Sequence, residues 1–177
     1  MTTLILAVVV ALFAVQQAPA PPKPGADHKV LAADAGTWDA VIEMAAEPGK
    51  PPTKSKGVEV NTLGCGGLCL VTSFKGDVGG MAFEGSGVTT WDPKKKKYVG
   101  SWTDSMSTGL SIAESTYDAA KKTFTGWMEG PDMTGNIMKA RSHTEMPSAN
   151  TRVFTLYGPG PDGKEAQMMK ITYTRRK

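Results

Sequence analysis

The chain has 177 residues, of which 40% are hydrophobic, with 20 Gly and 12 Pro. This length suits one domain with a substantial core, and the Gly and Pro content indicates many turns while excluding a low-complexity chain. The net charge of +3 is small, and the basic runs at 94–97 and 175–177 contain no interleaved aromatic residues. We therefore expect no nucleic-acid partner, and we interpret these runs as a solvated turn and a terminal tail.

An uninterrupted apolar run extends from Leu4 to Val15. It is too short to span a bilayer, which needs about 20 residues, and it fits the apolar core of a secretory signal peptide. Small residues at 18–20 suit a cleavage site, although Pro21 would hinder cleavage directly after Ala20. We predict a signal peptide over 1–20, a Pro-rich linker over 21–26 and export to the periplasm or outside the cell. The alternative is an uncleaved leader, which would be the one contact with a membrane.

A short helix is the first element expected after the linker. The segment 27–36 can form one or two helical turns, with Asp27 capping the first N–H groups and Gly36 ending the helix. From Trp38 onward the hydrophobic pattern changes to a period of two, which is typical of strands.

About ten strands follow, separated by turn signals every 10 to 15 residues. This spacing leaves no room for long helices and predicts an all-β antiparallel meander, closed into an up-and-down barrel that removes both sheet edges. The domain is expected over 27–177, with strands at 38–44, 54–63, 68–76, 81–91, 97–106, 109–117, 123–130, 137–146, 151–158 and 165–175.

The two cysteines, Cys65 and Cys69, lie on either side of a Gly-Gly pair. A straight strand would hold their Cα atoms about 13 Å apart, which is too far for a disulfide, but Gly66 and Gly67 can turn the chain back. A disulfide is therefore possible in an oxidising compartment, and the alternative is two small buried thiols. Two cysteines and two histidines without paired spacing predict no zinc site.

The first strand begins with Gly36, a spacer and Trp38. We expect the short helix to plug one end of the barrel, Gly36 to turn the chain out of it, and Trp38 to point inward and seal the floor. In a closed meander the last strand lies beside the first. Arg175 or Arg176 would then lie near Trp38, where a guanidinium can stack on the indole.

Several segments carry a resemblance to a known group: HKVLAADAGTWDA, LGCGGLCLVTSFKG, FEGSGVTTWDPKKKKYVGSWTDSMSTG, ESTYDAAKKTFT and YGPGPDGKEAQMMKITYTRR. The Gly-x-Trp after a short helix resembles the calycin group of lipocalins, fatty-acid-binding proteins and nitrobindins. The five segments together resemble the bacterial domain-of-unknown-function family 1579 over residues 27–176. The resemblance implies a calycin-like, lipocalin-like barrel and implies no catalytic residues.

Strand alternation suggests which residues face the barrel interior. If Trp102 points inward, so do Tyr98, Asp104 and Met106. Asp104 is the best single polar candidate, and its alternative role is to cap the turn that follows it. We predict a ligand site formed by inward residues of several strands. Its members are Trp38, Tyr98, Trp102, Asp104, Met106, Met128 and Arg141.

Residues 137–146 present two alternating sets, and either could face inward. The more apolar set contains Met138 and Ala140, which would leave Arg141 and His143 on the outside. In the alternative, the interior is partly polar and holds Asp104, Glu114, Arg141 and His143, with Arg141 binding an anionic ligand.

The ten methionines are numerous for this length. Methionine fills irregular core space, and it also adapts to varied apolar ligands. The methionines on expected strands could serve either purpose; they are Met81, Met106, Met128, Met138, Met168 and Met169.

No catalytic motif or nucleophile–base spacing is present, so we expect a binding protein and no enzyme. The leading hypothesis is an exported barrel that holds a small, largely apolar molecule, with no cofactor and no metal. A second hypothesis is a nitrobindin-like barrel that binds haem through an inward His143. A third is a barrel with a filled interior that binds a protein partner through its surface.

Overall fold

A computed structural model describes residues 20–45, 51–160 and 162–177. The predicted signal peptide therefore lies outside the described residues, except for Ala20, and the linker that follows has no regular secondary structure. None of the helices in the described ranges has the length and apolar character needed to cross a bilayer. The elements are the helix α1 (Ala26–Ala33) and the strands β1 (Gly36–Met44), β2 (Thr53–Gly64), β3 (Cys69–Val78), β4 (Met81–Asp92), β5 (Lys97–Asp104), β6 (Ser111–Asp118), β7 (Thr123–Pro131), β8 (Ile137–Ser148), β9 (Thr151–Pro159) and β10 (Glu165–Arg175).

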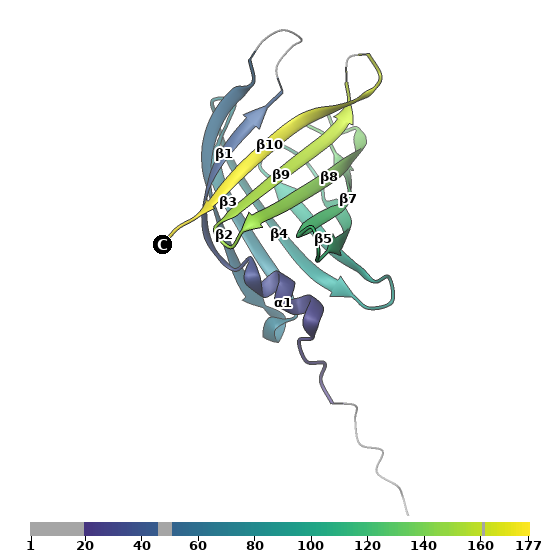
Figure 1. The fold of residues 1–177 in the computed structure, drawn as a ribbon. Coiled ribbons are helices and arrows are strands. Elements are labelled where there is room, and N and C mark those ends of the chain that lie inside the picture. Colours follow the sequence, from purple (N-terminus) through teal and green to yellow (C-terminus); the bar gives the residue numbers. More distant parts are fainter. Residues whose placement is uncertain (1–19, 46–50, 161) are drawn as a thin grey trace, which may run out of the picture.

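The ten strands form one closed antiparallel barrel, in which each strand pairs with its neighbours in sequence and β10 returns to pair with β1. The prediction of an all-β meander barrel is confirmed, and the strand bounds differ from those expected by only a few residues at the ends. Figure 1 shows α1 lying across one end of the barrel, with the last residues of β1 and β9 and the first residues of β2 and β10 at the opposite end. We call these the helix end and the open end.

The interior face can be followed from strand to strand through the register. Trp38 on β1 is 1% exposed and lies opposite Glu59 on β2, which lies opposite Phe74 on β3. Residues directly opposite each other share a face of the sheet. A core cluster on β1, β3 and β10 fills this side of the interior, and its buried members are Trp38, Ala40, Ile42, Phe74, Ile171 and Tyr173.

The helix α1 is shorter than expected and is capped differently. Gly25 occupies the N-cap position, and its backbone N–H donates to Nδ1 of His28 at 3.0 Å. Asp27 lies in the first turn, so the expectation that it is the cap was wrong; the helix begins one residue earlier. Leu31 is buried against Leu70 and Tyr98. Gly36 opens β1 with a φ of 136°, a conformation that only glycine adopts readily, as the chain turns from helix to strand.

The β2–β3 connection at the helix end is a single 3-10 turn at Cys65–Gly67. Gly66 and Gly67 both have positive φ, and they bring the Cα atoms of Cys65 and Cys69 to 5.6 Å. The two sulfur atoms form a disulfide. The bond therefore closes a Gly-Gly turn. The sequence had left two alternatives open, a disulfide and two buried thiols, and the structure has the disulfide.

Candidate functional site

The floor of the barrel is built around Trp38 and Arg175, which lie opposite each other on β1 and β10. The guanidinium of Arg175 lies 4.1 Å from the centre of the Trp38 ring, so the stacking expected for Arg175 or Arg176 is formed by Arg175. Arg175 also donates hydrogen bonds to the backbone carbonyls of Ala33 and Ala35 at the end of α1. This one side chain therefore joins the helix to the first and last strands.

A second arginine, Arg152 on β9, is buried beside Trp38. It forms ion pairs with Asp34, the C-cap of α1, and with Glu59 on β2. Asn61 donates hydrogen bonds to Asp34 Oδ2 at 3.2 Å and to Glu59 Oε1 at 2.8 Å. The side chains of all three charged residues are less than 15% exposed. We call these four residues, Asp34, Glu59, Asn61 and Arg152, the Arg152 cluster.

Aromatic rings cover the Arg152 cluster. The guanidinium of Arg152 lies 4.0 Å from the ring centre of Tyr173 and 5.1 Å from that of Trp38. A guanidinium is weakly hydrated and stacks well on aromatic faces, which makes arginine suited to such a buried position. Burial and the nearby Glu59 carboxylate raise the pKa of the Tyr173 hydroxyl well above its usual value. Tyr173 therefore remains neutral. The acids of the Arg152 cluster are Asp34 and Glu59, and its base is Arg152.

The pKa of Asp34 is raised to about 6, chiefly by burial; Arg152 and Arg175 lower it, while Glu59 acts in the same direction as burial. A folded-state pKa above the ordinary value means that the ionised carboxylate is less favourable in the folded state than in the unfolded chain. The folded state binds the proton more tightly between about pH 6 and pH 4. Stability from this group therefore rises as the pH falls through that window.

We predict that the substitution Asp34→Asn removes this pH dependence. The difference in unfolding free energy, wild type minus Asp34→Asn, should rise by about 2 kcal/mol between pH 7 and pH 4, because the folded protein takes up the Asp34 proton near pH 6 and the unfolded chain only near pH 4. Urea unfolding of both proteins across this range measures the difference, in which the titration of distant groups cancels. A difference that falls with decreasing pH would show that the Arg152 ion pair outweighs burial.

The remaining part of the floor is aromatic and lies beneath α1. Tyr98 on β5 is 2% exposed, and its ring packs against Trp91 and Phe124 at 4.9 and 5.1 Å between ring centres. Its hydroxyl donates to the backbone carbonyl of Asp27 at 3.1 Å. Burial raises the pKa of Tyr98 to about 12, so this donor keeps its proton. Tyr98, a candidate ligand residue, thus faces inward but holds the helix in place.

The interior face of β5 to β8 is lined mainly by small side chains. The register places Gly100 opposite Ala113, Ser115 opposite Gly126, and Gly126 opposite Ser142. Since Tyr98 is buried and lies opposite Ser115, this set faces inward. We call it the small-residue wall; its members are Gly100, Ala113, Ser115, Gly126, Ala140 and Ser142.

The two sides of the interior differ in how well they are covered. Trp38, Ile42 and Phe74 are at most 3% exposed, so these three inward side chains of β1 and β3 are fully packed. By contrast, large inward residues beside the small-residue wall, such as Met128 and Leu156, are only half-buried. Met128 and Leu156 are therefore less completely covered than the large side chains of the core cluster.

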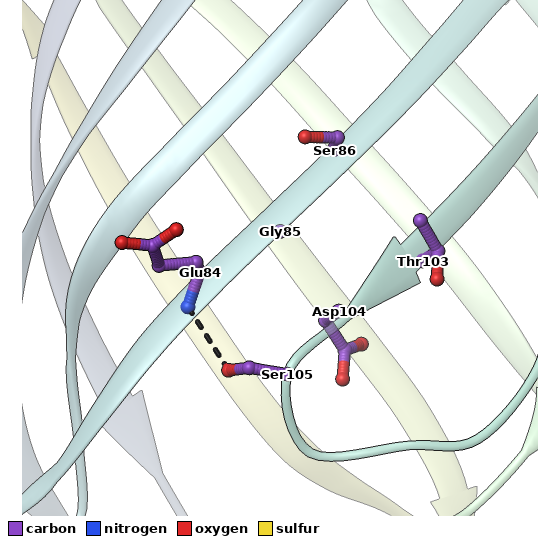
Figure 2. Close-up of a pocket in the computed structure, with 6 residues that line it drawn as sticks. All are labelled: Glu84, Gly85, Ser86, Thr103, Asp104 and Ser105. Atoms are coloured by element: carbon purple, nitrogen blue, oxygen red, sulfur yellow. Dashed lines mark hydrogen bonds between the residues drawn. The ribbon is translucent and has the colours of Figure 1, made fainter.

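Asp104 lies at the open end of β5 (Figure 2), and Trp102 lies two residues before it on the same face. The Trp102 ring lies against Gly85, where an added Cβ would approach a ring atom to 2.2 Å. Asp104 accepts hydrogen bonds from the Trp102 indole, the Met106 backbone and the Ser107 hydroxyl, at 2.9 to 3.1 Å. This is the turn-capping role considered as the alternative for Asp104. Met106 itself lies in the turn after β5 and is half-buried.

A groove of about 250 Å³ crosses the ends of β4 and β5 at this point, as the side chains in Figure 2 show. Glu84 and Ser105 flank it and are joined by a hydrogen bond of 3.1 Å from the Glu84 backbone N–H to the Ser105 hydroxyl. Gly85, Ser86, Thr103 and Asp104 also line the groove. Its donors and acceptors are largely used within the protein, so we do not assign it a ligand.

The structure places Arg141 on the outer face of β8, which corrects its assignment to the ligand site. Arg141 lies opposite Trp127 and Tyr157, and it forms a bidentate ion pair with Glu165 with atoms 2.7 to 3.1 Å apart. The apolar residues Met138 and Ala140 face inward instead. Hydrophobicity had favoured this arrangement, and the physical reason is that an unpaired charge in the interior would be costly.

The polar-interior alternative is also wrong for Glu114 and His143. Glu114 lies on the outer face of β6, where hydrogen bonds from Lys95 and Lys97 lower its pKa to about 2. His143 lies on the outer face of β8, with Nδ1 3.2 Å from the Thr125 hydroxyl. The haem hypothesis required an inward His143, so its structural premise is not met.

Six methionines gather toward the open end of the barrel. Met44 and Met169 pack partly against the core cluster, and Met128 and Met138 lie on inward positions of β7 and β8. Met168 lies beside Gly158, where an added Cβ would approach its sulfur to 2.3 Å. Met81 is 50% exposed at the start of β4. Methionine thus occurs both beside the core cluster and at exposed positions near the open end.

The Arg152 cluster was missed by the sequence analysis. A signal was present, since Arg152 alternates with Phe154 and Leu156, and Glu59 shares a strand face with Asn61. A charged residue at an inward position of an apolar alternation indicates a buried ion pair. Pairing the two required knowing that β2 and β9 approach each other through the interior, which no local pattern shows.

Comparison with known proteins places this geometry in context. The sequence profile of a family described as "Protein of unknown function (DUF1579)" matches residues 23–175. No curated protein matches the chain. Among solved structures, an S-type phycobiliprotein lyase, CPES, from Guillardia theta is 11% identical with a TM-score of 0.55, over 85% of this chain and 93% of that one. A redesigned beta barrel is 13% identical with a TM-score of 0.42, over 84% and 96%. The phycobiliprotein lyase shares the calycin-like barrel fold, and the chain, matched over nearly all of its described residues, belongs to the DUF1579 family.

Proposed function

We propose that the barrel binds a small, neutral and largely apolar molecule against the small-residue wall. The observation that carries the proposal is a contrast between large inward side chains: Trp38, Ile42 and Phe74 are at most 3% exposed, whereas Met128 and Leu156, beside the small-residue wall, are half-buried. A barrel of this kind can hold one ligand in its interior. On the wall, the short side chains of Ala113, Ser115 and Ser142 leave more space for such a ligand than bulkier side chains would.

The chemistry of the wall supports a neutral ligand. All inward residues of β6, β7 and β8 are uncharged, and the polar groups among them include the hydroxyls of Ser115 and Ser142. Binding would come mainly from apolar burial, with these hydroxyls orienting the ligand. Met128 and Met138 can adapt to its shape. The buried Arg152 is already paired with two carboxylates, so it is not free to bind an acid.

The test uses the substitution Ser142→Phe, which places a ring on the small-residue wall beside Gly126 and Leu156. We expect at least a tenfold weaker Kd for N-phenyl-1-naphthylamine, a neutral apolar dye that fluoresces when it is shielded from water. The added ring occupies the space that the dye would use. Fluorescence titration measures binding, and thermal unfolding verifies that the variant folds.

The matched control is His143→Phe, one residue along the same strand but on the outer face. It adds the same ring to the surface, and we expect a Kd within twofold of the wild type. An unchanged Kd in folded Ser142→Phe, or no saturable binding by the wild type, would contradict the proposal. That result would favour a filled barrel that acts through its surface.

Export is a further part of the proposal. The apolar run at Leu4–Val15 supports it, and so does the Cys65–Cys69 disulfide, because such bonds persist in oxidising compartments. Expression in a bacterial host followed by intact mass measurement would give the mature N-terminus and the two-hydrogen loss of the disulfide. A cytosolic, full-length and reduced protein would contradict export.

A further inference from the structure

Lysines gather at the helix end of the barrel. The β4–β5 turn contributes Lys94, Lys95, Lys96 and Lys97, and the β6–β7 turn contributes Lys121 and Lys122. These turns join four consecutive strands of the sheet, so they lie about 10 Å apart, twice the strand spacing. Lys97 is 38% exposed, and the other five are also exposed. We call these six residues the lysine end.

Neighbouring carboxylates compensate only part of this charge. Glu114 pairs with Lys95 and Lys97, and Asp118 lies 3.7 Å from Lys121. Asp92 accepts hydrogen bonds from two backbone N–H groups of the turn. Six lysines against three carboxylates leave an excess of three positive charges. Among the six described residues of the lysine end, those without a salt bridge are Lys94, Lys96 and Lys122.

The opposite end of the barrel has a different charge. The strand ends and connections there carry Asp77, Asp104, Asp132 and Asp162, with Lys164 as a nearby base. The protein as a whole has a net charge of only +3. The excess of three positive charges at the lysine end equals this total. The charge is therefore polarised along the barrel axis rather than spread evenly. Such a field orients a protein toward an anionic surface.

The N-terminal chain reaches the barrel at this same end. Residues 20–25 lead directly into α1, below the barrel in Figure 1. Six residues span at most about 20 Å when extended. The apolar run at Leu4–Val15 lies a few residues further on, and a segment of this composition partitions into a bilayer. Any protein held by this run would have its helix end facing the lipid.

From these observations we propose that the lysine end docks on the surface of an anionic bilayer, with the lysines contacting lipid phosphate groups. Lysine is well suited to this because its ammonium is a compact charge on a long flexible stem. Each lysine near an anionic bilayer strengthens binding roughly fivefold. Docking in this orientation directs the open end of the barrel into the aqueous phase. The proposal does not depend on the ligand proposed above.

The experiment is co-sedimentation of the full chain with two kinds of vesicle, phosphatidylcholine alone and phosphatidylcholine with about 30% phosphatidylglycerol. The ratio of the two partition coefficients isolates the contribution of charge, since an apolar leader binds both vesicles alike. We expect a ratio well above one for the wild type. The triple substitution Lys94→Gln, Lys96→Gln and Lys122→Gln should lower this ratio at least tenfold.

The control removes the same charge from the barrel wall, through Lys56→Gln, Lys75→Gln and Lys139→Gln. These lysines are exposed, and they lie on the outer faces of β2, β3 and β8. We expect this control to change the ratio by less than threefold. An equal loss in both triple variants, a wild-type ratio near one, or binding to soluble heparin without binding to the anionic vesicles would overturn the proposal. The last result would assign the lysines to a polyanion instead.

Discussion

Replacing Arg152 with methionine is expected to lower the free energy of unfolding by about 3–5 kcal/mol at pH 7. Methionine has a similar length and keeps much of the packing against Tyr173, so the loss comes from charge. The carboxylates of Asp34 and Glu59, which are 14% and 7% exposed, would remain buried without a cation. Urea unfolding with the disulfide intact measures the change.

A triple variant separates the charge effect from packing. In Arg152→Met with Asp34→Asn and Glu59→Gln, no charge remains in the cluster, and we expect most of the stability to return. Replacing a whole buried ion pair by neutral groups is often nearly neutral, whereas removing one partner is costly. A loss below about 1 kcal/mol in Arg152→Met alone would mean that the two acids take up protons at little cost.

Replacing Trp38 with alanine is expected to cost about 3–5 kcal/mol, the range for large aromatic side chains in a core. Trp38 is 1% exposed, and its indole donates to the Asp34 carbonyl at 3.0 Å. The substitution would leave a cavity at the floor and remove the ring on which Arg175 stacks. Thermal and urea unfolding measure the loss, and faster hydrogen exchange in α1 would show that the helix has loosened.

The matched control for this prediction is Trp127→Ala. Trp127 lies on the outer face of β7, with the ammonium of Lys139 4.1 Å from its ring centre. The same atoms are deleted, but no core cavity forms, so we expect a loss of about 1 kcal/mol or less. Similar losses for the two tryptophans would show that Trp38 does not act as the seal of the barrel floor.

The fold of this protein could be predicted from its sequence because the signals are local. A period of two, interrupted by turns such as Asp92-Pro93, is set by each strand's own pleat and by turn chemistry. The pairing of Trp38 with Arg175 followed as well, since closing a meander leaves only one place for the last strand. These predictions needed no knowledge of contacts across the interior.

The candidate site was harder to predict because alternation separates two faces without saying which is inside. On β8 the sequence offered both sets, and the inward one is set by the register that places Ser142 opposite Gly126. Asp104 faces inward as expected, but its hydrogen bonds are used within its own turn. The Arg152 cluster joins residues from α1, β2 and β9, and such a meeting depends on the diameter and stagger of the whole barrel.

The pairing of β10 with β1 also decides when this chain can fold. Trp38 on β1 pairs with Arg175 on β10, so these two strands can pair only after nearly the whole chain has been synthesised. Until then, the sheet has two unpaired edges, which can pair with other chains. Contacts of such long sequence separation form slowly. Truncated products that lack β10 should therefore aggregate rather than accumulate as smaller folded barrels, and their clearance would fall to chaperones and proteases.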